Sequence, residues 1–342
     1  MVTLYDTCKI VIGAKYSIIQ DLQRGLIIRV PREVIEYFDC KKRKLLSSHY
    51  IEEIETFLLD NELGFITKEP SLFPESGNNF VDFHDIEYFI LIYSKYNYKY
   101  LARLFNEISK LQIWHFEIRF YDLVSKFKIR KVIKFVEGCG ARSLDLFIKY
   151  NEKEDLNLYK ELIIKHPIIN IIVLHSCPLE QCINKNNNLL LTSKIIDSNK
   201  HCGIIDINTM MITYDSYRIS KKFNSCLYKK IAIDEFGYIK SCPSMQTHYG
   251  NICVDNLGSI INNKYFIELY SINKDLISKC KDCEYRFACS DCRAYIENPN
   301  DIYSAPLKCG YNPYNGEWEI WDSNPLKKGA IEYYDKLTNG KN

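Results

Sequence analysis

The sequence predicts an α/β protein built from three parts and a C-terminal tail, and three observations predict it. Short apolar strands and two capped helices fill the first 70 residues, strands and helices alternate after residue 80, and eight of the 14 cysteines lie between Cys226 and Cys309. We therefore expect a winged-helix-like element over 1–70, a partial βα sheet over 80–200, a cysteine-rich domain over 201–325 and a helical tail over 326–342.

The N-terminal element is predicted from its turn and cap residues. Strands over 8–19 and 26–30 are joined by a turn at Gly25, and Pro31 suits the first position of a helix over 31–38. Ser47 and Ser48 can cap the next helix, whose apolar side chains recur at helical spacing. A short wing strand over 65–67 and a linker over 71–79 complete this element.

The middle part shows strands that alternate with helices. Strands are expected over 89–93, 113–121, 143–149 and 168–175, and helices over 98–111, within 123–136 and over 154–165. This alternation indicates a parallel sheet with helical crossovers. Because about four such units cannot close an eight-stranded barrel, we expect an open half-barrel.

Charge and apolar runs exclude several classes of protein. The net charge of +2 gives no basic surface for nucleic acid or an anionic membrane, and the longest apolar runs have the length of a strand. The first ten residues lack the pattern of an export signal, so a cytoplasmic protein is expected. In a reducing compartment, cysteines are metal ligands or buried thiols more often than disulfides.

The cysteine spacing predicts two metal centres that share one loop. Cys226 is followed by ten residues, then Gly237, then four residues, then Cys242. Further along come the run Cys280-x2-Cys283-x5-Cys289-x2-Cys292 and, after another gap, Cys309. A C-x2-C pair presents two thiolates from one tight turn, and a third cysteine can fold back to the same centre. The last cysteine of such a run ligates the other cluster in two-cluster ferredoxins.

A structural zinc module is the alternative to iron–sulfur clusters. Zinc ribbons usually separate their two C-x2-C pairs by about 15–20 residues, whereas five residues separate Cys283 from Cys289. All-thiolate ligands at this spacing favour iron–sulfur clusters, and zinc stays open as the second interpretation.

The spacing resembles the SPASM domain, the C-terminal extension of peptide-modifying radical SAM enzymes. Its motif is C-x(9–15)-G-x4-C, then C-x2-C-x5-C-x3-C and a last cysteine; this chain departs once, with two residues between Cys289 and Cys292. The resemblance implies two auxiliary [4Fe–4S] clusters. One would be held by Cys280, Cys283, Cys289 and Cys309; the other would have Cys226, Cys242 and Cys292, with Cys202, Cys253 or His248 as candidates for its fourth ligand.

The cysteine triad of radical SAM enzymes is missing from this sequence. Such enzymes carry C-x3-C-x2-C just after the first barrel strand, where this chain reads Ser-Lys-Tyr-Asn-Tyr-Lys-Tyr over 94–100. No C-x3-C-x2-C occurs elsewhere in the sequence. We therefore expect no cleavage of S-adenosylmethionine, and a non-catalytic accessory role rather than an enzyme.

This combination resembles the SPASM-domain peptide maturase of grasp-with-spasm systems, which make graspetides, a class of ribosomal peptides. There the SPASM protein accompanies an ATP-grasp ligase and a short precursor peptide. The resemblance implies a degenerate radical-SAM-like half-barrel between a SPASM iron–sulfur domain and a winged-helix element that binds the leader peptide as an added strand.

The expected function is therefore assistance to an ATP-grasp ligase that forms side-chain crosslinks in a bound precursor peptide, with no nucleic-acid or membrane partner. Two alternatives stay open. One is a redox-active iron–sulfur enzyme with an open iron site, and the other is a zinc-stapled scaffold with the same partners.

Overall fold

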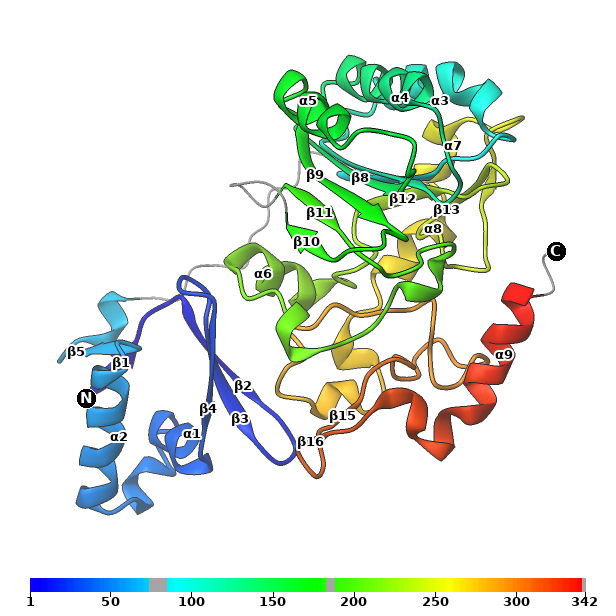
Figure 1. Ribbon diagram of the computed structural model, residues 1–342. Helices are drawn as coiled ribbons and strands as arrows, with labels where there is room; N and C mark the ends of the chain where they lie inside the picture. Colours follow the sequence, from blue (N-terminus) through cyan, green and yellow to red (C-terminus); the bar gives the residue numbers. More distant parts are fainter. Residues whose placement is uncertain (74–84, 183–187, 340–342) are drawn as a thin grey trace. The chain divides into compact units, whose positions relative to one another are not determined.

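The structure, a computed structural model, describes residues 1–73, 85–182 and 188–339 (Figure 1). It divides into two compact units. The first comprises Met1–Phe80, Gly203–Tyr228 and Tyr270–Asn342, and the second comprises Val81–Cys202 and Lys229–Leu269. The chain thus leaves and re-enters each unit, and the consecutive domain boundaries expected from the sequence stay a prediction.

A nine-stranded, mostly parallel sheet forms the centre of the second unit. Its order is β10-β11-β9-β8-β7-β6-β12-β13-β14. The strands from β11 to β12 run parallel to their neighbours, and β10, β13 and β14 are antiparallel at the two ends. The bounds are β6 (Tyr88–Ile92), β7 (His115–Phe120), β8 (Ser143–Lys149), β9 (Ile169–His175), β10 (Gln181–Cys182), β11 (Leu189–Leu191), β12 (Lys230–Ile233), β13 (Tyr238–Lys240) and β14 (Gly250–Asn251). The expected α/β class with a parallel sheet is confirmed.

Helical crossovers connect the parallel strands. These are α3 (Leu101–Ile108), α4 (Lys126–Gly138) and α5 (Asn157–Lys165), which lie together beyond the sheet in Figure 1. Phe116, Ile118 and Phe120 alternate along β7 and are buried. The ring of Phe105 in α3 lies 6.5 Å from that of Phe116, so this face of the sheet packs against the helices.

The segment after residue 228 extends the large sheet and then forms two helices. β12 and β13 pair as an antiparallel hairpin, and β12 also pairs in parallel with β6. The helices are α7 (Leu257–Ile261) and α8 (Lys264–Tyr270). Asn262 ends α7, and the chain restarts at Lys264.

The N-terminal element contains two small sheets and two helices. An antiparallel sheet joins β2 (Cys8–Ile12), β3 (Ser17–Asp21) and β4 (Leu26–Val30), and β1 (Val2–Leu4) pairs with β5 (Gly64–Ile66). The single strand expected over 8–19 was wrong, because the chain turns at Gly13, whose N–H donates to the carbonyl oxygen of Tyr16 at 2.9 Å.

The two helices follow the predicted caps. Pro31 precedes α1 (Arg32–Phe38), and Ser47 caps α2 (Ser48–Asp60) by accepting the Tyr50 N–H. Their apolar faces bury Cys8, Ile19 and Val30 of the sheet. The likeness of this element to a winged helix stays a prediction, and residues 74–79 of the expected linker lie outside the described residues.

The cysteine-rich part of the first unit is mostly loops and short helices. Its regular elements are α6 (Tyr214–Lys222), β15 (Tyr311–Asn312), β16 (Glu317–Trp318) and α9 (Lys328–Asn339). Short 3-10 helices include η6 (Lys274–Leu276) and η7 (Cys280–Asp282). The others in the chain are η1 (Arg43–Leu45), η2 (Pro70–Leu72), η3 (Tyr98–Tyr100), η4 (Asn199–His201), η5 (Ile207–Thr209), η8 (Trp321–Ser323) and η9 (Pro325–Lys327).

The described helices include none with the length and apolar character needed to cross a membrane.

Candidate metal centre

Four of the predicted ligands line one cavity in the first unit. Cys280 opens η7, and Cys283 follows its end, with the Cys283 N–H donating to the Cys280 carbonyl oxygen at 3.0 Å. Cys289 returns to the cavity after one tight turn, because its N–H donates to the carbonyl oxygen of Tyr285 at 3.0 Å. Cys309 arrives from a separate loop, and all four side chains contribute to the lining. Their role as ligands stays a prediction.

The described residues that line the cavity are mostly apolar, and they include no carboxylate. Apolar and aromatic residues complete the wall, namely Ile205, Met210, Tyr285, Pro306, Tyr311 and Trp318. Its two charged lining residues, Lys274 and Arg286, are both cations. Four thiols with nearby cations form a donor set that suits an anionic metal–thiolate group.

Burial makes these thiols poor acids on their own. It raises the pKa of Cys280 to about 12 and that of Cys289 to about 11; Lys274 opposes this rise, and the Cys309 thiol and Asp291 carboxylate add to it. Burial also raises the pKa of Cys283. A metal that binds here must therefore displace protons from the thiols as it enters.

The positions of these side chains match no single-ion site. Within residues 1–73, 85–182 and 188–339, no three His, Cys, Asp or Glu side chains are placed to share one metal ion. Tetrahedral zinc draws its sulfur ligands to about 2.3 Å from one centre, whereas a [4Fe–4S] cluster takes four thiolates around a larger core. Zinc and an iron–sulfur cluster both use such an all-thiolate donor set.

The turn between β2 and β3 is hydrogen bonded to the cysteine loop. Arg286 donates from Nη1 to the carbonyl oxygens of Ile12 and Cys283, at 2.7 and 2.9 Å. Val11 of β2 and Ile18 of β3 are paired residues, and they pack in one apolar cluster with Tyr285, Phe287 and Tyr311. The N-terminal sheet is therefore part of the packing that surrounds the cavity.

The second predicted ligand set is divided between the two units. Cys226 and Cys292 belong to the first unit, and Cys242 belongs to the second. Asn224 connects the loops of the first two, because its side chain accepts the Cys226 N–H at 3.1 Å and donates to Asp291 at 2.7 Å. This ligand set stays a prediction.

The candidates for its fourth ligand lie at separate places in the second unit. Cys202 Sγ lies 3.9 Å from Nη2 of Arg119. Cys253 Sγ lies 3.6 Å from the Tyr96 hydroxyl. The His248 ring packs against that of Tyr238, with 4.3 Å between centroids.

Sequence reasoning missed a buried polar side chain in the loop after β6. Asn97 is fully buried there, and its Nδ2 donates to the carbonyl oxygens of Ile92 and Asp234, at 2.7 and 3.1 Å. Its Oδ1 accepts the Ser94 N–H at 3.0 Å. The amide therefore holds the loop 94–100 against the β12–β13 turn, and no signal in the sequence distinguished it from a surface asparagine.

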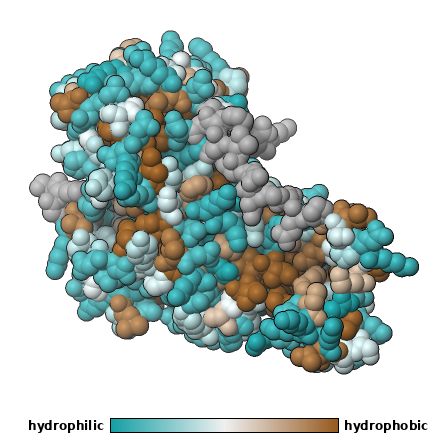
Figure 2. Space-filling model, turned by 180° about the vertical axis from the view of Figure 1, so that it is seen from behind, coloured by the Kyte–Doolittle hydropathy of each residue, from teal (hydrophilic) through white to brown (hydrophobic). Residues whose placement is uncertain are grey.

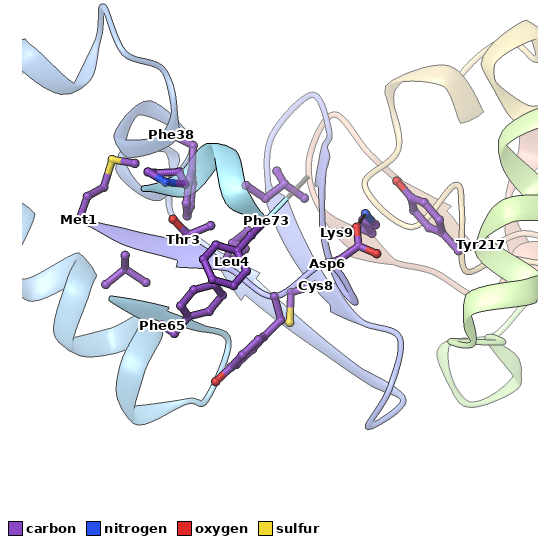
Figure 3. Close-up of a pocket in the computed structure, with 14 residues that line it drawn as sticks. Met1, Thr3, Leu4, Asp6, Cys8, Lys9, Phe38, Phe65, Phe73 and Tyr217 are labelled. Carbon is purple, nitrogen blue, oxygen red and sulfur yellow. Dashed lines mark hydrogen bonds and ion pairs between the residues drawn. The ribbon is translucent and has the colours of Figure 1, made fainter. Parts of the chain in front are cut away.

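A groove of about 650 Å³ lies in the first unit along two strands (Figure 3). Val2–Leu4 of β1 and Cys8–Ile10 of β2 line it. Each of these strands is at the edge of its sheet in the described part of the chain. The backbone at a sheet edge can pair with an added strand.

The groove has an apolar end and a charged end. Leu4, Phe65 and Phe73 gather at one end in Figure 3, with 4.7 Å between the centroids of the two phenyl rings. At the other end, Lys9 Nζ pairs with Asp6 Oδ1 at 2.7 Å. Figure 2 shows apolar atoms gathered on the surface of the N-terminal element, and the exposed side chains there include Phe73 and Leu72.

Comparisons with known proteins give little beyond this geometry. No protein-family model and no curated protein matches the chain. Among solved structures, the chain is similar to Streptococcus suis SuiB bound to S-adenosylmethionine, with 11% identity and a TM-score of 0.32 over 90% of this chain and 99% of that one. A TM-score of this size does not establish a shared fold, so the function is argued from the residues themselves.

Proposed function

We propose that this chain is a SPASM-type accessory protein of ribosomal peptide maturation. It holds an iron–sulfur cluster at Cys280, Cys283, Cys289 and Cys309, and a precursor peptide in the N-terminal groove. The single observation that carries the proposal is the convergence of these four cysteines on one mostly apolar cavity.

The metal content of the purified chain tests this first. We expect iron and acid-labile sulfide in equal amounts after anaerobic purification. Cys280→Ser should remove the metal of one site, whereas Cys40→Ser, which changes an exposed thiol, should keep the wild-type content. Zinc without sulfide would establish the scaffold alternative, and a metal-free chain would contradict the proposal.

The groove supports the peptide-binding part of the proposal. An extended peptide gains backbone hydrogen bonds from a sheet edge and specificity from side-chain pockets. The apolar end formed by Leu4, Phe65 and Phe73 suits an apolar side chain of such a peptide. The leader would then be held on the same unit as the four cysteines.

Fluorescence anisotropy with a labelled synthetic leader peptide from a candidate precursor tests the groove. Phe73→Glu places a charge at the apolar end and should weaken binding at least tenfold. Phe127→Glu changes an exposed phenylalanine on α4 of the second unit and is the matched control. Equal affinities of the two variants would rule out the groove as the binding site.

The accessory role has a separate test. An ATP-grasp ligase and its precursor peptide, incubated with ATP, should form crosslinks faster when this chain is added, as measured by loss of water in mass spectra. Equal rates and products with and without the chain would contradict the accessory role, and they would leave the metal assignment intact.

A further inference from the structure

Lys274 is a buried cation in the wall of the cysteine cavity. It begins η6, it is 4% exposed, and it lines the cavity together with the four cysteines. Its positive charge lowers the pKa of Cys289 against the effect of burial. A lysine seldom loses its hydration in this way unless it is paired, so its partners determine what it does.

One buried carboxylate pairs with two buried cations, one of which is Lys274. Asp291 is 1% exposed, and its Oδ1 lies 3.8 Å from Lys274 Nζ and 2.7 Å from Arg293 Nη2. Its Oδ2 accepts a hydrogen bond from Asn224 at 2.7 Å. Because Asp291 is shared between Lys274 and Arg293, these three side chains carry one more positive than negative charge.

The surplus charge points to an anion in the cavity. Burying an uncompensated charge is costly, and an oppositely charged group within a few ångströms offsets that cost. Among the described residues the cavity lining includes no carboxylate, and the other lining cation, Arg286, pairs with Asp275 at 3.0 Å. The buried Glu284 next to Cys283 accepts a hydrogen bond from Tyr311. Four thiolates around a metal core have a net negative charge, which the Lys274 ammonium in the cavity lining can balance.

We propose that Lys274 is the counter-charge of the metal–thiolate group, a positioning residue that stabilises the bound thiolates without ligating the metal. This rests on the proposed function, because it requires a metal at the four cysteines. It adds the reason why a net-cationic network is buried beside them. Removing the charge should speed the loss of metal, and restoring it should reverse that effect.

The test compares metal release from the full-length, metal-loaded chain to excess EDTA. Lys274→Met removes the charge and keeps most of the side-chain length, and Lys274→Arg retains the charge. Lys240→Met is the matched control, since Lys240 is also 4% exposed and pairs with an aspartate, Asp234, at 2.7 Å, but lies in the second unit. We expect release at least tenfold faster from K274M, and near-wild-type rates from K274R and K240M.

The possible results distinguish a failure of the counter-charge role from a failure of the proposed function. A wild-type chain that holds no metal contradicts the proposed function and this inference with it. A metal-loaded wild type and a K274M variant with equal release rates overturn the counter-charge alone. Far-UV circular dichroism checks folding, and Lys274→Gln repeats the test if K274M does not fold. If neither neutral variant folds while K240M does, Lys274 is required for folding, and the proposal is overturned.

Discussion

The backbone N–H of Ala14 donates to the carbonyl oxygen of Asp282 at 2.7 Å, which ties the turn between β2 and β3 to the loop between the first two candidate ligands. Arg286 makes the second connection through the Ile12 carbonyl oxygen. The sheet that borders the groove and the loop that carries Cys280 and Cys283 are thus held together by hydrogen bonds, and a change in either is expected to affect the other.

Gly13 at this turn leaves no room for a methyl group. A Cβ atom there would lie 2.7 Å from the Tyr16 carbonyl oxygen and 2.8 Å from the Glu284 backbone nitrogen. We expect Gly13→Ala to lower the free energy of unfolding by about 1–3 kcal/mol, the usual cost of overpacking. Urea denaturation measures it, and Gly138→Ala on α4, which meets no atom within 4 Å, is the control. Equal midpoints for the two variants would show that the turn can move away from the loop.

Metal removal should loosen the N-terminal sheet. If the four cysteines hold a cluster, its loss frees the loop that is hydrogen bonded to Ala14 and, through Arg286, to Ile12, so β2 and β3 should lose protection. Hydrogen–deuterium exchange of the loaded and chelator-treated chain measures this. Strands β7 and β8 of the second unit are the internal control. Unchanged exchange in β2 and β3 would mean that the loop keeps its shape without metal.

Asn97 should matter more to stability than its sequence context suggests. Asn97→Ala removes a donor from the buried carbonyl oxygens of Ile92 and Asp234, and Asp234 keeps the Gly237 N–H at 3.0 Å. An unsatisfied buried polar group costs about 1–3 kcal/mol, so we expect a loss of about 1–3 kcal/mol. The exposed Asn106→Ala on α3 is the matched control in urea denaturation. A loss equal to that of the control would mean that water replaces the amide.

Local patterns predicted the parts of the fold that depend on local structure. Ser47 and Pro31 marked the helix starts, and alternating apolar residues marked β7 and β8, because caps and side-chain periodicity act within a few residues. Cysteine spacing likewise grouped Cys280, Cys283 and Cys289, which lie within ten residues of one another.

The sequence did not predict which distant strands pair or which charged side chains become buried. The parallel pairing of β12 with β6 joins strands more than a hundred residues apart, and nothing within either strand specifies its neighbour. The three-residue β1 is too short for a period to be visible. Lys274 and Asp291 read as surface charges in a polar stretch, since only the folded loops remove them from water.

Lys229 gives a prediction for the pH dependence of stability. Burial lowers its pKa to about 8, although Glu87 lies 3.3 Å from its Nζ, while an unfolded lysine has a pKa of about 10.4. Between these values the unfolded chain binds the proton that the folded chain has lost. The stability contribution of Lys229 should therefore rise with pH from about 8 to about 10.4.

The free energy of unfolding of the wild type minus that of Lys229→Met isolates this effect from other groups that titrate at high pH. Methionine keeps the apolar stem and cannot titrate, so the difference should be least favourable to the wild type at pH 7 and should grow through pH 8, 9 and 10. Lys95→Met, an exposed site in the same unit, is the control for general alkaline effects. A difference that stays flat, or that falls with pH, would mean that the pair with Glu87 keeps Lys229 charged in the fold throughout this range.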